Sequence, residues 1–229
     1  MSNWVNTESI LSKKIDFEDK VILDIGCGNG WFSERSFSQG AKNVFAIDPI
    51  KEQIEMAKRN SKYNINFKVA FAEDLPFENN KFDLIFFFNS LHHVSPGMIK
   101  KALNEGKRVA KETGHMFIIE PLSTGTFNEI LKLVDDEKNI RAKAYSEISN
   151  FYQNTLTSNE EIFYEEKKEF NQFSEFCNLL LSADPKRKDM IVNIKDKLIN
   201  KFNSLSEYTN NKYQFIQPMR MNIIKFNKK

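Results

Sequence analysis

Short apolar runs alternate with amphipathic segments along the first 120 residues of the chain. The runs have the length of strands, and they predict strands at residues 21–25, 44–48, 67–71, 82–88 and 115–119. The segments between them predict helices at residues 31–39, from near Pro49, and from Ser95-Pro96, where a capping residue precedes a proline. Strands that are apolar throughout and separated by helices predict a parallel sheet with both faces covered.

The pattern changes after Pro121. An amphipathic helix is predicted where apolar residues recur at helical spacing, at Phe127, Ile130, Leu131 and Val134. Further elements are predicted as a strand at residues 161–170, helices at 171–181 and 186–205, and a strand at 213–226. Residues 1–229 are therefore predicted to form a single α/β domain. Its sheet is doubly wound, seven-stranded and mostly parallel, with helical insertions in the C-terminal half.

Composition and charge narrow the class of protein. Lys and Arg total 33 and Asp and Glu total 31, which gives a net charge of +2 and disfavours nucleic acid as a partner. No apolar stretch approaches the roughly 20 residues that cross a bilayer, and residues 1–14 show no secretion signal. Cys27 and Cys177 lie far apart, and no Cys/His cluster has the spacing of a zinc site. We expect a cytoplasmic protein with neither membrane insertion nor a metal site.

A glycine-rich segment follows the first predicted strand. Residues 23–30 read Leu-Asp-Ile-Gly-Cys-Gly-Asn-Gly, at the edge of a parallel sheet where ligands of such folds bind. The dinucleotide fingerprint requires a further glycine where this chain has Trp31, and no Gly-Lys-Ser/Thr of a phosphate-binding loop follows. The spacing favours a ligand without a pyrophosphate. Cys27 is interpreted as a small residue beside the ligand and not as a nucleophile.

A carboxylate ends the second predicted strand. Asp48 lies 18 residues after Gly30, where an acid can accept hydrogen bonds from both hydroxyls of a ribose. Glycine segment and acid together predict a nucleoside site. The alternative is that Asp48 only caps the helix that begins at Pro49.

The chain carries five motifs whose sequence and order resemble those of the class I S-adenosylmethionine-dependent methyltransferases. The resemblance is to the type 11 group in particular, with the ubiquinone and menaquinone C-methyltransferases. The resemblance covers about residues 20–121 and rests on residues 21–30, 46–48, 72–77 with 81–85, 91–94 and 105–121. It implies S-adenosylmethionine as the cofactor of an enzyme with a Rossmann-like fold. Residues 20–121 would form the cofactor-binding core, and residues 122–229 would supply substrate-facing helices and the final strands.

The resemblance also implies roles for single residues. Asp24 would reach the amino group of the cofactor's methionine part, and Asp48 would bind its ribose. Phe71 stands where many relatives have an acid that faces the adenine, so the backbone N–H of Ala72 or packing by Phe71 would take over that contact. Asn89 would lie near the sulfonium. The implied cofactor-binding set is Asp24, Gly26, Cys27, Gly28, Gly30, Asp48, Pro49, Phe71, Ala72, Glu73 and Asn89.

Two histidines follow the fourth predicted strand. His92 and His93 are the candidate catalytic residues, because an imidazole can remove a proton from an acceptor at neutral pH. The alternative is that they orient the loop. Arg220 can bind a substrate carboxylate or be an exposed side chain on an edge strand. Aromatic residues that can line an acceptor pocket are Trp4, Tyr145, Phe151 and Tyr152. The alternative, favoured for any single one of them, is that it only closes the hydrophobic core.

The predicted function is methyl transfer to an N, O or C atom of a small-molecule acceptor by in-line displacement. One alternative is an RNA or protein methyltransferase, suggested by the basic cluster Lys186-Arg187-Lys188. Another is a non-catalytic S-adenosylmethionine-binding protein, suggested by Phe71 and by the absence of an obvious base.

Overall fold

The computed structural model describes residues 6–153 and 157–226, so that Trp4 lies outside the described residues. The described chain divides into two compact units, each built from separate segments. The larger unit contains residues 11–120, 140–153, 157–162 and 220–226, and the smaller unit contains residues 6–10, 121–139 and 163–219. The single domain over residues 1–229 stays a prediction.

The strands join in one sheet in the order β3-β2-β1-β4-β5-β8-β6. Their bounds are β1 Val21–Ile25, β2 Asn43–Asp48, β3 Asn66–Val69, β4 Phe82–Phe88, β5 Ala110–Pro121, β6 Thr157–Phe170, β7 Glu207–Thr209 and β8 Lys212–Phe226. The seven predicted strands form this path, and the pairs among β3, β2, β1, β4 and β5 are parallel. The short β7, antiparallel to β8, makes the sheet of the described residues eight-stranded and not seven-stranded.

The strand register brings the carboxyl ends of four strands to one edge of the sheet in the larger unit. Ile25 of β1 lies opposite both Ile47 of β2 and Phe87 of β4, and Phe87 lies opposite Ile118 of β5. All four side chains are buried, because these strands are covered on both faces. The glycine segment, Asp48 and the two histidines follow these strands and therefore lie at the same edge.

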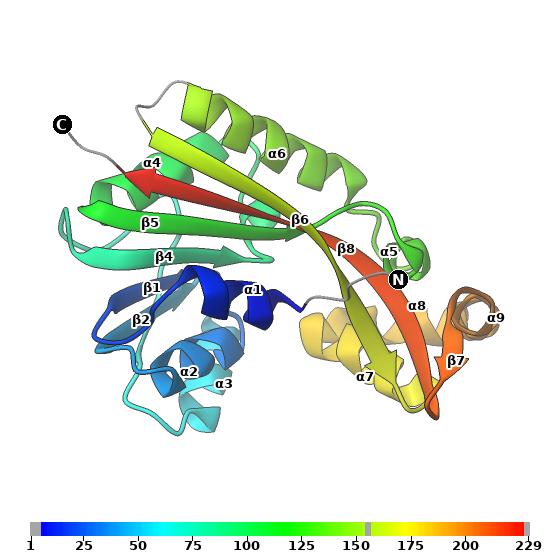
Figure 1. The fold of residues 1–229 in the computed structure, drawn as a ribbon. Helices are drawn as coiled ribbons and strands as arrows, with labels where there is room; N and C mark the ends of the chain where they lie inside the picture. Colours follow the sequence, from blue (N-terminus) through cyan, green and yellow to red (C-terminus); the bar gives the residue numbers. More distant parts are fainter. Residues whose placement is uncertain (1–5, 154–156, 227–229) are drawn as a thin grey trace. The chain divides into compact units, whose positions relative to one another are not determined.

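Helices of the larger unit cover both faces of its sheet (Figure 1). Two helices, α2 (Trp31–Ser38) and α3 (Lys51–Asn60), cover one face, where the rings of Phe32 and Phe86 lie 4.7 Å apart. The opposite face is covered by α4 (Ile99–Val109) and α6 (Lys138–Gln153), whose apolar residues join one core with Ile85 and Phe87. The doubly wound architecture is therefore confirmed.

One helix prediction was wrong at its N-terminal boundary. The helix expected from Ser95-Pro96 begins at Ile99, because the amide of Met98 closes a turn onto the Ser95 carbonyl oxygen at 2.7 Å. The helix expected from near Pro49 begins at Lys51, in agreement with that prediction. The short helical elements α1 (Thr7–Lys14) and η1 (Leu91–His93) were not predicted.

The smaller unit is built around phenylalanine side chains. Its helical elements are α5 (Thr126–Leu131), α7 (Phe173–Ala183), η2 (Pro185–Arg187), α8 (Lys188–Asn193) and α9 (Lys195–Leu205). Its core contains Phe127, Phe170, Phe176, Phe202 and Phe215. The single helix predicted over residues 186–205 is interrupted at Ile194, whose φ of −108° and ψ of 16° are not helical. None of the helices in the described ranges has the length and hydrophobicity to span a membrane.

Candidate functional site

The glycine segment forms a tight loop between β1 and α2. Gly26, Gly28 and Gly30 have φ values of 74°, 53° and 84°, in the left-handed region that favours glycine. The amides of Gly26 and Cys27 donate to the Ile47 carbonyl oxygen at 2.8 and 2.9 Å. These bonds fix the loop against the end of β2.

The three glycines serve different purposes. A Cβ on Gly26 would lie 2.4 Å from Cβ of Ser90, and one on Gly30 would lie 2.9 Å from the ring of Phe67. A Cβ on Gly28 would meet nothing within 4 Å. Gly26 and Gly30 are therefore required by protein packing, whereas Gly28 leaves open space above the loop that a ligand can approach.

Asp48 connects the glycine loop to the segment after β2. One carboxylate oxygen accepts the N–H of Gly28 at 3.0 Å, and the other accepts the N–H of Ile50 at 2.9 Å. The alternative that Asp48 caps the next helix is wrong in its simple form, because α3 has Ile50 at its N-cap and no side-chain cap. Each oxygen keeps a lone pair for a further donor.

Asp24 and Cys27 are buried beneath the loop. Burial raises the pKa of Asp24 to about 7, the hydroxyl of Ser33 opposes this by donating at 2.6 Å, and the charge of Asp48 adds to the rise. Burial likewise raises the pKa of the Cys27 thiol, and the charges of Asp24 and Asp48 reinforce it. The thiol therefore stays protonated and is a poor nucleophile, in agreement with the interpretation of Cys27 as a small residue.

The raised pKa of Asp24 predicts that stability falls with rising pH. Between the unfolded value of 3.8 and the folded value of about 7, the folded chain binds the extra proton. At pH values below this range Asp24 is protonated in both states, and its burial costs no stability. At pH values above it, the buried charge destabilises the fold by on the order of a few kcal/mol. We expect Asp24→Asn to flatten the slope of unfolding free energy between pH 4 and 7, measured by urea denaturation. An unchanged slope would contradict the assignment.

The segment after β3 presents Phe71 to solvent. Phe71 is 57% exposed and bridges to Asp74, so the strand predicted over residues 67–71 ends at Val69. Ala72 is buried, and within the described residues its amide has no hydrogen-bond acceptor. Glu73 is half-buried and Pro49 is exposed. The free amide of Ala72 and the exposed ring of Phe71 fit an aromatic ligand such as adenine.

A second turn follows β4 at the same edge. Asn89 has a φ of 51° and is exposed, so it is a left-handed turn residue as well as a ligand candidate. The backbone N–H of Asn89 donates to the Ile119 carbonyl oxygen at 2.8 Å, and the hydroxyl of Ser90 donates to the Ile25 carbonyl oxygen at 2.6 Å. These bonds place the turn beside the glycine loop.

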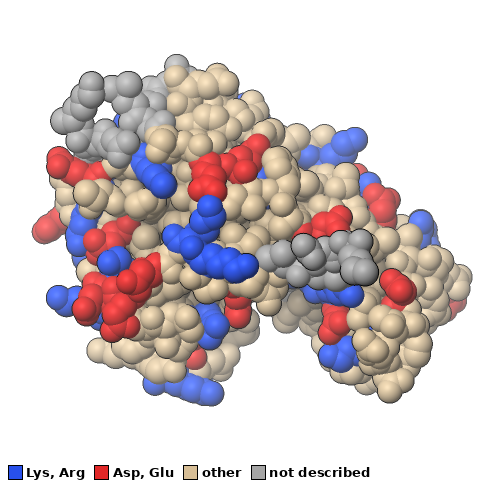
Figure 2. Space-filling view, viewed as in Figure 1, with Lys and Arg blue, Asp and Glu red and all other residues tan. Residues whose placement is uncertain are grey.

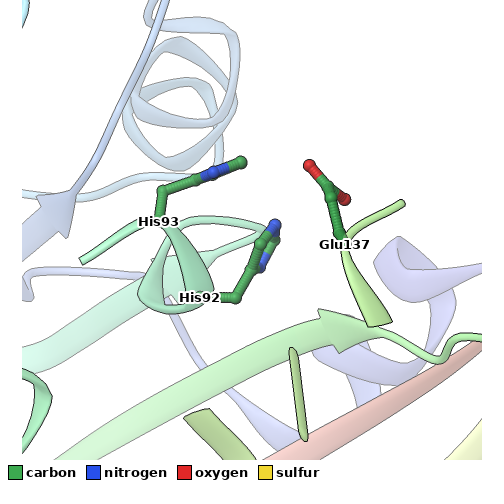
Figure 3. Close-up of side chains that lie close together, drawn as sticks. All are labelled: His92, His93 and Glu137. Atoms are coloured by element: carbon green, nitrogen blue, oxygen red, sulfur yellow. The ribbon is translucent and has the colours of Figure 1, made fainter. Parts of the chain in front are cut away.

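His92 and His93 project from this turn (Figure 3). Their ring centroids lie 4.0 Å apart, but His92 is buried and His93 is exposed. Nδ1 of His92 hydrogen-bonds the buried carboxylate of Glu120, which also accepts the N–H of Leu91 at 3.0 Å. His92 therefore anchors the turn to the end of β5, and His93 is the accessible imidazole. Glu137, labelled in the same figure, belongs to the smaller unit.

Glu120, which holds His92, is a residue of this edge that the sequence did not point to. It is 2% exposed and ends the apolar part of β5. The signal that could have found it is an acid at the carboxyl end of a strand predicted to lie beside β4.

Comparison with known proteins shows which family shares the segment that carries the glycine loop. Residues 22–114, which carry the glycine loop, Asp48 and both histidines, match the methyltransferase domain family. The chain contains a class I methyltransferase domain. S-adenosylmethionine is the cofactor of this domain. The predicted family and cofactor are thereby confirmed.

Curated relatives share the methyltransferase domain but differ in their stated substrates. The chain is 39% identical over 133 residues to the ubiquinone biosynthesis O-methyltransferase of Pelagibacter ubique, covering 57% of this chain and 51% of the relative. It is 31% identical over 113 residues to the tRNA U34 carboxymethyltransferase of Nautilia profundicola, covering 46% of this chain and 38% of the relative. The matches thus span about half or less of these relatives.

The crystal structure of the YcgJ protein from Bacillus subtilis has the same fold. It superposes with a TM-score of 0.63 at 20% identity and covers 94% of this chain and 96% of its own. The similarity therefore extends over both units of the chain, beyond the methyltransferase domain matched in sequence.

The residues of the loop fit S-adenosylmethionine. The cofactor carries no phosphate, in agreement with Trp31 at the position where the dinucleotide fingerprint has its last glycine. Trp31 is 49% exposed, and its ring packs edge-on to that of Phe88 at 5.0 Å. The open space over Gly28 leaves room for a ligand, and Asp48 keeps lone pairs to which ribose hydroxyls can donate.

Proposed function

We propose that the chain transfers the methyl group of S-adenosylmethionine to a nucleophilic N, O or C atom of a small-molecule acceptor. The observation that carries this proposal is the pairing of Asp48 with Gly28 beneath open space, inside the segment that matches the methyltransferase domain. Asp48 would bind the ribose, the glycine loop would support the methionine part, and Ala72 with Phe71 would contact the adenine. Asn89 would lie by the sulfonium.

Bound S-adenosylmethionine supplies a methyl group that its sulfonium already activates. The chain then has to hold the acceptor atom about 3 to 3.5 Å away and in line with the breaking bond. It also has to keep water out of that path. Residues 122–229 would select the acceptor, with Tyr145 and Tyr152 among the side chains that line its place. Phe151 belongs instead to the hydrophobic core of the larger unit.

A proton acceptor is required only where the acceptor atom is protonated. We propose His93 for this step, because it is the exposed member of the pair, and His92 with Glu120 as its support. His93→Gln is expected to lower kcat about a hundredfold or more while leaving the affinity for S-adenosylhomocysteine unchanged. A kcat within twofold of the parent would contradict the role.

The proposed function is tested by incubating the purified protein with methyl-labelled S-adenosylmethionine and fractionated cell extract. We expect label in a low-molecular-weight fraction and binding of S-adenosylhomocysteine by calorimetry. Binding without label in any fraction would instead favour the non-catalytic alternative. Absence of binding at millimolar ligand would overturn the proposal.

An RNA acceptor is the second candidate, because several curated relatives are named tRNA U34 carboxymethyltransferases. In the smaller unit, Arg187 of the basic cluster is ion-paired with Asp135 at 2.8 Å. On the face shown in Figure 2, Lys and Arg side chains are interspersed with Asp and Glu. This distribution favours the small acceptor. Label in tRNA, with binding that weakens steeply as salt rises, would support RNA instead.

A further inference from the structure

Arg220 of β8 is a buried cation in the larger unit. It is 6% exposed, and β8 lies between β5 and β6 in the sheet. The alternative that Arg220 is an exposed side chain on an edge strand is therefore wrong. A buried guanidinium requires partners, because its desolvation is costly.

The protein holds this guanidinium mainly by its Nε end and its flat face. Nε donates to the side-chain oxygen of Asn222 at 3.1 Å, and the carbon Cζ lies 3.7 Å from the ring centroid of Tyr145. The nearest carboxylate oxygen, on Glu161, is 3.9 Å from Nε, too far for a hydrogen bond. The Glu161 carboxylate instead accepts from Asn222 at 2.9 Å and from the Tyr145 hydroxyl at 3.4 Å.

The two Nη nitrogens of Arg220 lack acceptors. Among the described residues, none accepts a hydrogen bond from either of them. In the described part of the chain, neither Nη atom is one of the fully enclosed side-chain atoms that lack a partner. Both therefore reach the surface of a side chain that is otherwise buried and are open to a ligand. The fork of a guanidinium matches the two oxygens of a carboxylate or phosphate.

Arg220 lies on β8, the neighbour of β5 in the sheet, and Glu120 near the end of β5 holds the turn that carries the histidines. Burial lowers the pKa of Arg220, and the charges of Glu161, Tyr145 and Glu120 oppose this, Glu120 being the carboxylate that holds His92. All of these residues belong to the larger unit, and Tyr145 comes from α6, which covers the same face as α4. A group bound by Arg220 would therefore extend from the acceptor side of the proposed methyl-transfer site.

We propose that the acceptor is a small metabolite with a terminal carboxylate or phosphate, bound by the Nη atoms of Arg220 above the ring of Tyr145. This inference rests on the proposed function and names the chemical class of its acceptor. A terminal oxyanion suits a guanidinium that is 6% exposed. A phosphodiester within a polymer carries sugar on both sides and would require a more open approach.

The first test uses the full-length protein, methyl-labelled S-adenosylmethionine and low-molecular-weight extract separated on an anion-exchange resin. We expect label in acceptors that the resin retains. Prior treatment of the extract with phosphatase abolishes the label if the group is a phosphate and leaves it if the group is a carboxylate. Label only in unretained molecules would overturn this inference and leave the proposed function intact. Label in no fraction would overturn both.

The second test compares variants on the retained acceptor. Arg220→Gln is expected to raise KM about a hundredfold with S-adenosylhomocysteine affinity unchanged. Arg220→Lys keeps the charge but not the fork, so it should recover only part of the loss. The exposed Arg59 on α3 supplies the matched control, and Arg59→Gln should behave as the parent. An unchanged KM in either Arg220 variant would overturn the inference.

Discussion

Replacing Asp48 with alanine is expected to weaken the binding of S-adenosylhomocysteine about a hundredfold or more. The carboxylate accepts hydrogen bonds from the N–H groups of Gly28 and Ile50 at 3.0 and 2.9 Å. Its removal therefore releases the glycine loop and also removes the proposed hydrogen bonds to the ribose. Hydrogen bonds to a charged group each contribute about 1.5 to 3 kcal/mol, which makes two lost bonds sufficient for this effect. Isothermal titration calorimetry measures it directly.

Asp48→Asn and a remote acid provide the controls. Asparagine keeps one acceptor oxygen, so an intermediate loss of affinity is expected. Asp189 on α8 is exposed, and Asp189→Ala should bind the ligand as the parent does. An Asp48→Ala protein with parental affinity would remove the ribose assignment while leaving the fold unaffected.

The parts of this site that the sequence predicted are those that depend on neighbours in the chain. The glycine segment and Asp48 each follow a strand whose apolar run ends with it, so a parallel sheet is enough to bring them to one edge. The stripe of α4 is similar: Ile99, Leu103 and Gly106 are buried as their helical spacing predicts. In these segments, local pattern and tertiary packing agree.

The parts that the sequence did not reveal depend on partners that are distant in the chain. Glu120 meets His92 across 28 residues, because the pairing of β4 with β5 aligns Phe88 with Ile119. The helix α6 was predicted only in part, as a charged stretch over residues 135–143 that continues or follows the preceding helix, because its buried stripe begins with Arg141, a charged residue. The break at Ile194 between α8 and α9 has no glycine or proline to mark it.

Alanine substitution at two neighbouring glycines is expected to separate stability from ligand binding. In Gly26→Ala the new Cβ would lie 2.4 Å from Cβ of Ser90 at a φ of 74°, so we expect a loss of about 3 to 5 kcal/mol in the free energy of unfolding. In Gly28→Ala the new Cβ meets no protein atom, and the φ of 53° costs only about 1 to 2 kcal/mol. Urea denaturation without ligand measures both values.

For ligand affinity the larger loss is expected in Gly28→Ala and not in Gly26→Ala. The methyl group at position 28 would occupy the space where the methionine part of the cofactor is proposed to lie. Gly28→Ala is therefore expected to remain folded and to lose affinity for S-adenosylhomocysteine at least about tenfold. The gain in stability that the ligand gives to the parent should be absent in this variant. Gly97, whose Cβ position is also open but whose φ is not left-handed, gives the matched control: Gly97→Ala should retain both stability and affinity. If Gly28→Ala bound the ligand as tightly as the parent, the cofactor would not occupy the open space over the loop. The proposed role of the whole glycine segment in cofactor binding would then be wrong.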